Sequence, residues 1–151
     1  MSEVGGGPYL QIAVICEKVI DDKTDSLSLI RIIDNVTQTA TGPEPPEQMP
    51  PILLSNLMLV IALKAGKARG RYAVKVVVED PSGSQLPSAE IPVQLEGEFR
   101  GVNLVTPINV AAQHEGVYWF DVYFVASRDK ESLLTRIPLQ VHYQPQRIPP
   151  T

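Results

Sequence analysis

Acidic side chains are the first candidates for chemistry in this sequence. Asp21, Asp22 and Asp25 fall in one polar stretch, DDKTD, and Asp80 opens a second turn, DPSG. Calcium takes about six to eight oxygen ligands in proteins, so two such loops could form a calcium site if they meet. The other interpretation is a pair of solvated turns, in which Asp accepts hydrogen bonds from its own backbone. The turn interpretation is favoured, and a calcium- or anion-dependent ligand-binding domain is kept as the alternative function.

Nucleophiles and metal-binding side chains are few. Cys16 lies in an apolar run and is predicted to be a small buried hydrophobe. His114 and His142 have no Cys or His neighbour at the spacing of zinc ligands. No glycine-rich phosphate loop is present. The sequence therefore predicts a non-enzymatic protein without a cofactor.

Basic residues concentrate in one region, at Lys64, Lys67, Arg69, Arg71 and Lys75. Such a group could contact an anionic ligand or partner. Hairpin loops and edge strands also use these charges to prevent unwanted strand pairing. The second interpretation is favoured.

Composition narrows the class of protein. The chain has 151 residues, a net charge of −4 and a pI near 5.1, which argues against general nucleic-acid binding by phosphate neutralisation. The single cysteine excludes an internal disulfide framework. The start lacks the pattern of a signal peptide, and the longest apolar run is shorter than the roughly 20 residues that span a bilayer. We expect a cytoplasmic protein with neither membrane nor nucleic acid as a partner.

Two-residue periodicity dominates the chain. Leu10, Ile12, Val14 and Cys16 are predicted to share one face of a first strand, and clear alternation recurs over residues 71–79, 116–125 and 133–143. Residues 27–36 fit either a helix or a strand, and their β-branched side chains favour a strand. Pro92 and Pro107 cannot donate ladder hydrogen bonds, so their strands are expected at edges or bulges.

These segments predict an all-β fold, an antiparallel β-sandwich of roughly seven to nine strands, immunoglobulin-like or C2-like. We expect a flexible leader over residues 1–8, one domain over residues 9–144 and an extended tail over residues 145–151. The proline-rich stretch TGPEPPEQMPP reads as a long connection between sheets, with a proline-recognition ligand as the less favoured alternative.

Two resemblances support this fold. The segment HEGVYWFDV is similar to the one that enters a late strand of immunoglobulin-like domains. The order AVICEKVIDDKTDSLSLIRIID, a proline-bearing loop, a long apolar strand, VVVEDPSG and GVYWFDVYF resembles a bacterial family of uncharacterised small β-sandwich domains. This resemblance implies a fold and favours a strand over residues 27–36, but it implies no activity.

Aromatic and aliphatic side chains occur on both faces of two strands. If Tyr118 and Phe120 enter the core, Trp119 and Tyr123 face outward. In the same way, Leu57, Leu59, Ile61 and Leu63 inward would leave Met58, Val60 and Ala62 outward. An exposed apolar patch usually marks an interaction surface, although the proline-rich loop or the tail could cover it. We therefore expect a binding or assembly module that associates with a protein partner or with itself through Met58, Val60, Trp119 and Tyr123.

Overall fold

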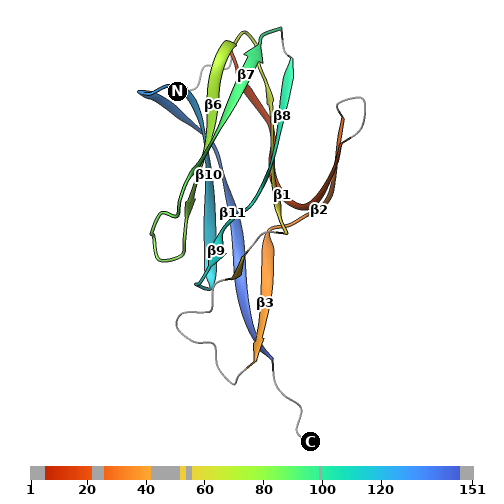
Figure 1. The fold of residues 1–151 in the computed structure, drawn as a ribbon, viewed down its shortest axis with the longest axis vertical. Helices are drawn as coiled ribbons and strands as arrows, with labels where there is room; N and C mark the ends of the chain where they lie inside the picture. Colours follow the sequence, from red (N-terminus) through yellow and green to blue (C-terminus); the bar gives the residue numbers. More distant parts are fainter. Residues whose placement is uncertain (1–5, 22–25, 42–51, 54–55, 99, 147–151) are drawn as a thin grey trace, which may run out of the picture.

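Two β-sheets face each other and make up most of the molecule (Figure 1). The structure is a computed structural model that describes residues 6–21, 26–41, 52–53, 56–98 and 100–146. Sheet A has the strand order β2 (Leu27–Ile32), β1 (Tyr9–Asp21), β5 (Met58–Lys64), β8 (Gly101–Pro107). Sheet B has the order β3 (Asn35–Thr41), β11 (Lys130–Gln146), β10 (Gly116–Ser127), β6 (Arg69–Glu79), β7 (Ala89–Glu96). A short pair joins β4 (Ile52–Leu53) to β9 (Ala111–Ala112).

The predicted all-β sandwich is confirmed, with nine strands in the two main sheets of the described chain. Every ladder is antiparallel except the one between β3 and β11, which is parallel. Residues 27–32 form β2 and residues 35–36 begin β3, with a break at Ile33 and Asp34, so the strand that the β-branched side chains favour is confirmed. At Asp34 the chain leaves sheet A and enters sheet B, where the N–H of Gln140 donates to the Asp34 carbonyl at 2.9 Å. None of the described segments is a helix able to cross a membrane.

The core follows the predicted alternation of the two apolar strands. On β10 the even residues Tyr118, Phe120, Val122 and Phe124 are buried. On β5 the odd residues Leu59, Ile61 and Leu63, with Leu57 before the strand, pack against them from the other sheet. Each side chain of this size contributes about 1.5–3 kcal/mol when fully buried, so the contact between β5 and β10 is a main source of stability.

The predicted face of β1 is wrong beyond its first residues. The register between β1 and β5 shifts between Leu10 and Ile12, which marks a β-bulge. A single extra residue turns all later side chains to the opposite face. Leu10 therefore packs on the core together with Ala13 and Ile15, whereas alternation had grouped it with Ile12.

The ends of the domain also differ from the expected bounds. Gly6 to Pro8, expected in a flexible leader, contact the turn after β5, where the N–H of Lys67 donates to the Gly6 carbonyl at 3.0 Å. Gly7 has φ +70°, and a Cβ there would lie 2.6 Å from the Ala65 carbonyl oxygen, so this approach requires glycine. At the other end β11 continues to Gln146, two residues into the expected tail. Pro92 and Pro107 lie in edge strands β7 and β8, as predicted.

Tyr118 connects the start of β10 to the preceding loop. Its side chain is 1% exposed. Its hydroxyl donates to the His114 carbonyl at 2.9 Å and accepts from the His114 N–H at 3.1 Å. Burial raises the pKa of Tyr118. A buried tyrosine that bonds to backbone a few residues upstream is also a feature of immunoglobulin-like sandwiches.

Removing that hydroxyl tests its contribution to stability. We expect Tyr118→Phe to lower the free energy of unfolding by about 1–2 kcal/mol, because two backbone groups of His114 lose their partner. The measurement is urea denaturation followed by circular dichroism. Tyr123→Phe, on the outer face of the same strand, is the matched control and should change the free energy by less than about 0.5 kcal/mol. Equal effects of the two variants would contradict this role for Tyr118.

Candidate binding groove

The hairpin of β1 and β2 extends beyond the rest of sheet A. The first half of β1 pairs with β5 as far as Cys16, and its second half pairs only with β2. The hairpin curls away from the sandwich (Figure 1). Its ladder is regular from Lys18 to Asp21 opposite Leu27 to Ile30. Leu27 and Leu29 therefore share one face, and Ile30, 38% exposed, lies on the other.

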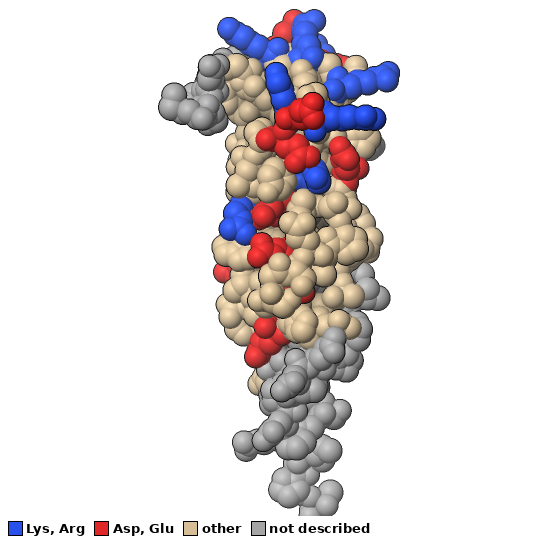
Figure 2. Space-filling model, turned by 90° about the vertical axis from the view of Figure 1, so that its left-hand side faces the viewer, with Lys and Arg blue, Asp and Glu red and all other residues tan. Residues whose placement is uncertain are grey.

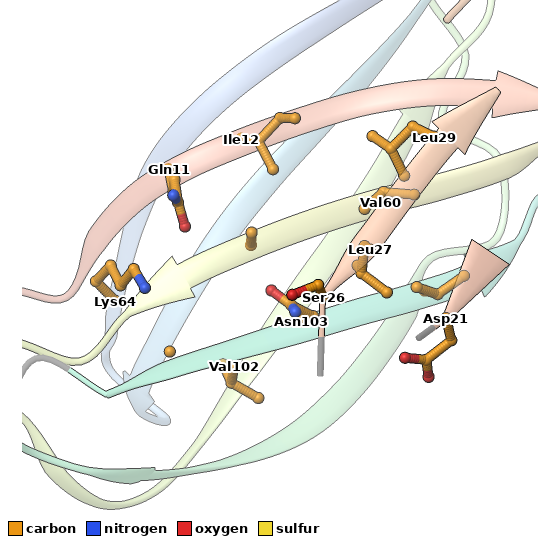
Figure 3. A pocket seen from close by; sticks show the side chains of 13 residues that line it. Gln11, Ile12, Asp21, Ser26, Leu27, Leu29, Val60, Lys64, Val102 and Asn103 are labelled. Carbon is orange, nitrogen blue, oxygen red and sulfur yellow. The ribbon is translucent and has the colours of Figure 1, made fainter. Parts of the chain in front are cut away.

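This curl encloses a groove of about 960 Å³ on the outer face of sheet A. Val60 and Ala62 of β5 contribute its apolar floor, and Leu27 and Leu29 approach from the hairpin (Figure 3). The complete lining consists of Gln11, Ile12, Asp21, Ser26, Leu27, Leu29, Val60, Ala62, Lys64, Gly101, Val102, Asn103 and Val105. The groove is thus lined by residues from all four strands of sheet A.

The groove is apolar in the middle and charged at its ends. Lys64 lies toward one end and Asp21 toward the other (Figure 3). In the described part of the chain no ion pair involves either of these two side chains. Amide groups of Gln11 and Asn103 add hydrogen-bonding capacity along the walls. This pattern suits a ligand that is elongated, apolar in part and able to hydrogen-bond.

The four predicted interface residues do not form one surface. Met58 and Val60 belong to β5 in sheet A, whereas Trp119 and Tyr123 belong to β10 in sheet B. The two pairs lie on the outer faces of opposite sheets, so the expectation of a single contiguous patch is wrong. Alternation along one strand cannot tell which sheet that strand joins. Val60 also has no exposed area in the monomer, so it cannot contribute to an exposed surface.

Trp119 is covered by a charged side chain of its own sheet. The guanidinium carbon of Arg136 lies 4.5 Å from the centroid of the Trp119 ring, a cation–π contact. The same guanidinium lies 2.7 Å from an oxygen of Asp121 and 3.7 Å from one of Glu79. The outer face of sheet B is therefore a network of paired charges over a half-buried aromatic ring.

Tryptophan fluorescence can test this cover, because the chain has a single Trp. We expect Arg136→Ala to shift the emission of Trp119 to longer wavelength and to increase its quenching by acrylamide, since the ring gains contact with water. Lys75→Ala is the matched control: it removes another cation of the same sheet, which pairs with Glu131 at 3.2 Å. An unchanged spectrum in Arg136→Ala would contradict the contact.

The predicted carboxylate site is not assembled by the described residues. Asp21 lies at the end of β1 and Asp80 in the turn after β6, on different sides of the molecule (Figure 1). Asp80 accepts from the N–H groups of Ser82 and Ser84 at 2.9 and 3.0 Å. The hydrogen bond from the Ser82 hydroxyl lowers the pKa of Asp80. The calcium alternative required the two loops to meet, and Asp21 and Asp80 do not. Asp80 stabilises its own turn, as the favoured interpretation predicts.

Asp22 and Asp25 lie outside the described residues. Over the described ranges, no group of three or more His, Cys, Asp and Glu side chains could hold a metal ion. Cys16 is fully buried, and burial raises the pKa of its thiol. A buried thiol of raised pKa is a poor nucleophile, as its apolar context predicts.

Basic side chains gather at one end of the sandwich. Lys and Arg cluster there in Figure 2, and acidic side chains lie below them. Arg69 pairs with Glu98 at 3.4 Å and Arg100 with Glu96 at 2.9 Å. These exposed pairs each contribute little stability and are consistent with the solubility role favoured for this cluster.

The sequence did not predict the groove, because the groove depends on how many residues of β1 continue beyond its pairing with β5. Leu27, Leu29, Asn103 and Val105 come from segments distant in sequence, and none stands out by type. One signal could have indicated them. The apolar residues Val60 and Ala62 on the second face of β5 require a cover, and the nearest apolar hairpin in sequence is the one that supplies it.

Comparison with protein families gives a match over most of the chain. The model of DUF6941, a family of unknown function, matches residues 11–142. The chain belongs to this family. The match runs from β1 to β11 and includes every residue that lines the groove. The DUF6941 domain is therefore the two-sheet sandwich together with its curled hairpin.

Two solved structures resemble the DUF6941 chain. One is the C-terminal domain of wzt, with a TM-score of 0.44 and 13% identity over 90% of this chain and 74% of that one. The other is an immunoglobulin-like protein from Pseudomonas aeruginosa, with a TM-score of 0.42 and 12% identity over 93% of this chain and 100% of that one. No curated protein matches the sequence.

Proposed function

We propose that the protein is a non-enzymatic binding module that receives an extended segment of a partner protein, one with both apolar and hydrogen-bonding side chains. The groove on the outer face of sheet A carries this proposal. Its volume of about 960 Å³ lies at the upper end of the range of ligand sites. Its partly exposed apolar side chains, Leu27, Leu29 and Val105, would lose contact with water when a segment binds, which supplies the driving force.

The shape of the floor favours an extended chain. Val60 and Ala62 are two residues apart on β5 and point the same way. Side chains two apart on an extended segment have the same spacing, about 6.6 Å. Every second side chain of a bound extended segment can therefore pack between Val60 and Ala62 or beside them. The charges of Lys64 and Asp21 at the two ends would set its direction.

The lining argues against other ligand classes. None of the thirteen lining residues is aromatic, so the groove lacks the stacking platforms on which single-stranded nucleic acids rely. Lys64 is its one cation, too little for phosphate neutralisation. The lining includes no thiol or imidazole, so no activated nucleophile lies in it.

Neighbouring residues of the hairpin provide a paired test. Linear peptides are selected from a random library on the wild-type protein, and their affinities are then measured on two variants by calorimetry. We expect Leu29→Asp to weaken binding at least about tenfold, near 1.4 kcal/mol, because it places a charge in the groove. Ile30→Asp is the control, since the side chain lies on the exposed face of the same strand.

The selected peptides should be apolar at alternate positions. Peptides that bind both variants with wild-type affinity would place the binding surface elsewhere. Peptides that lose affinity only for Ile30→Asp would assign binding to the convex side of the hairpin. Circular dichroism of each variant checks that the sandwich remains folded.

A further inference from the structure

Strand β8 is an edge of sheet A with little protection against pairing. The segment GVNLVTP contains no charged residue, and its single proline, Pro107, is the last residue. Val105 is 40% exposed. The neighbouring edge strand of sheet B differs, because β7 carries Glu90, Pro92 and Glu96. Natural edge strands usually carry charges or proline to prevent pairing with another chain, so β8 is an exception within this molecule.

The hydrogen bonds that flank β8 show which of its backbone groups are free. The N–H of Ala65 donates to the Arg100 carbonyl at 2.8 Å, and the N–H of Ile108 donates to the Leu57 carbonyl at 2.9 Å. In an antiparallel ladder the residues that bond to one neighbour alternate along the strand. The even residues from Arg100 to Ile108 therefore bond to β5.

The odd residues of β8 direct their backbone groups away from the sheet. These are the N–H and carbonyl groups of Gly101, Asn103 and Val105, which follow from the alternation above. Their side chains line the outer face of sheet A. Unpaired groups in such a row form a template for one more strand.

We propose that β8 pairs with β8 of a second copy of this chain, antiparallel and centred on Asn103. In this register Asn103 faces Asn103 of the second copy, and Gly101 faces Val105 of the second copy. In this register odd residues face odd residues, so each of these pairs exchanges both of its hydrogen bonds, and the even pairs between them are the non-hydrogen-bonded ones. The two four-stranded sheets A then become one continuous sheet.

Three features favour a second copy over a foreign strand. The free residues are spaced symmetrically about Asn103, as a twofold axis requires. The absence of charge on β8 removes like-charge repulsion between identical strands. At the axis the two Asn103 amides, each both donor and acceptor, can bond to each other.

Pro107 limits this contact. It is an odd residue without an N–H group, so the seam cannot continue past it.

The two grooves would lie on the same face of the joined sheet, on either side of the axis. The dimer would thus present two binding sites to a partner. This inference does not depend on what the grooves bind.

Light scattering after size exclusion tests the contact over a range of protein concentrations. We expect the wild type to approach a mass of about 33 kDa, twice the 16.6 kDa of one chain, as the concentration rises. Asn103→Lys places two like charges at the axis and should remain at 16.6 kDa. Gln94→Lys, an equally exposed position on the edge strand β7, is the matched control and should dimerise like the wild type.

A second variant separates pairing from folding. Val105→Pro removes an N–H that points away from β5, so sheet A keeps its own ladder while the seam loses hydrogen bonds. It should be a folded monomer by circular dichroism and thermal unfolding. A wild type that stays at 16.6 kDa at every concentration would overturn the proposal. So would a dimer that persists in both β8 variants, or a loss of dimer in Gln94→Lys as well. Peptide affinity for the groove is measured in a separate experiment, and its result does not decide whether the chain dimerises.

Discussion

Burial of β5 on both faces is the constraint on which the rest of this structure depends. Leu59, Ile61 and Leu63 fill the space between the sheets, and Val60 and Ala62 on the opposite face are also shielded from water. A sandwich normally leaves the outer face of each sheet to polar side chains. An apolar outer face must instead be covered by something. In this chain the β1–β2 hairpin leaves the edge of sheet A and curves beside this face, and a groove lies between the hairpin and the sheet.

The β-bulge near Gln11 determines which residues of β1 face the core and which face the groove. Before the bulge Leu10 faces the core, and after it Ala13 and Ile15 do. Ile12 consequently joins Val60 and Ala62 at the groove. A bulge also increases local twist, and β1 then continues beyond β5 as half of a two-stranded ribbon. Such ribbons twist more strongly than wide sheets, which accounts physically for the curl.

Local patterns predicted the elements well and their assembly poorly. Alternation in GVYWFDVYFV and in the strand of Leu59 predicted which side chains enter the core, because a period of two follows directly from strand geometry. The bulge in β1 was not predicted, since its cause is a pairing with a distant strand. The same limit explains why Trp119 and Val60 were placed on one surface. Which sheet a strand joins is decided by long-range contacts that no single segment contains.

The two outer faces differ in how their charges are used, and this difference supports the proposed binding at sheet A. On sheet B, Arg136 contacts Trp119, Asp121 and Glu79 at once, so aromatic and charged groups satisfy one another within the monomer. On sheet A, Lys64 and Asp21 form no ion pair with any described residue, and the floor between them is apolar. Groups already paired must be separated before they can bind a partner, which costs free energy. Groups that are not paired carry no such cost, so sheet A is the side on which a ligand gains most.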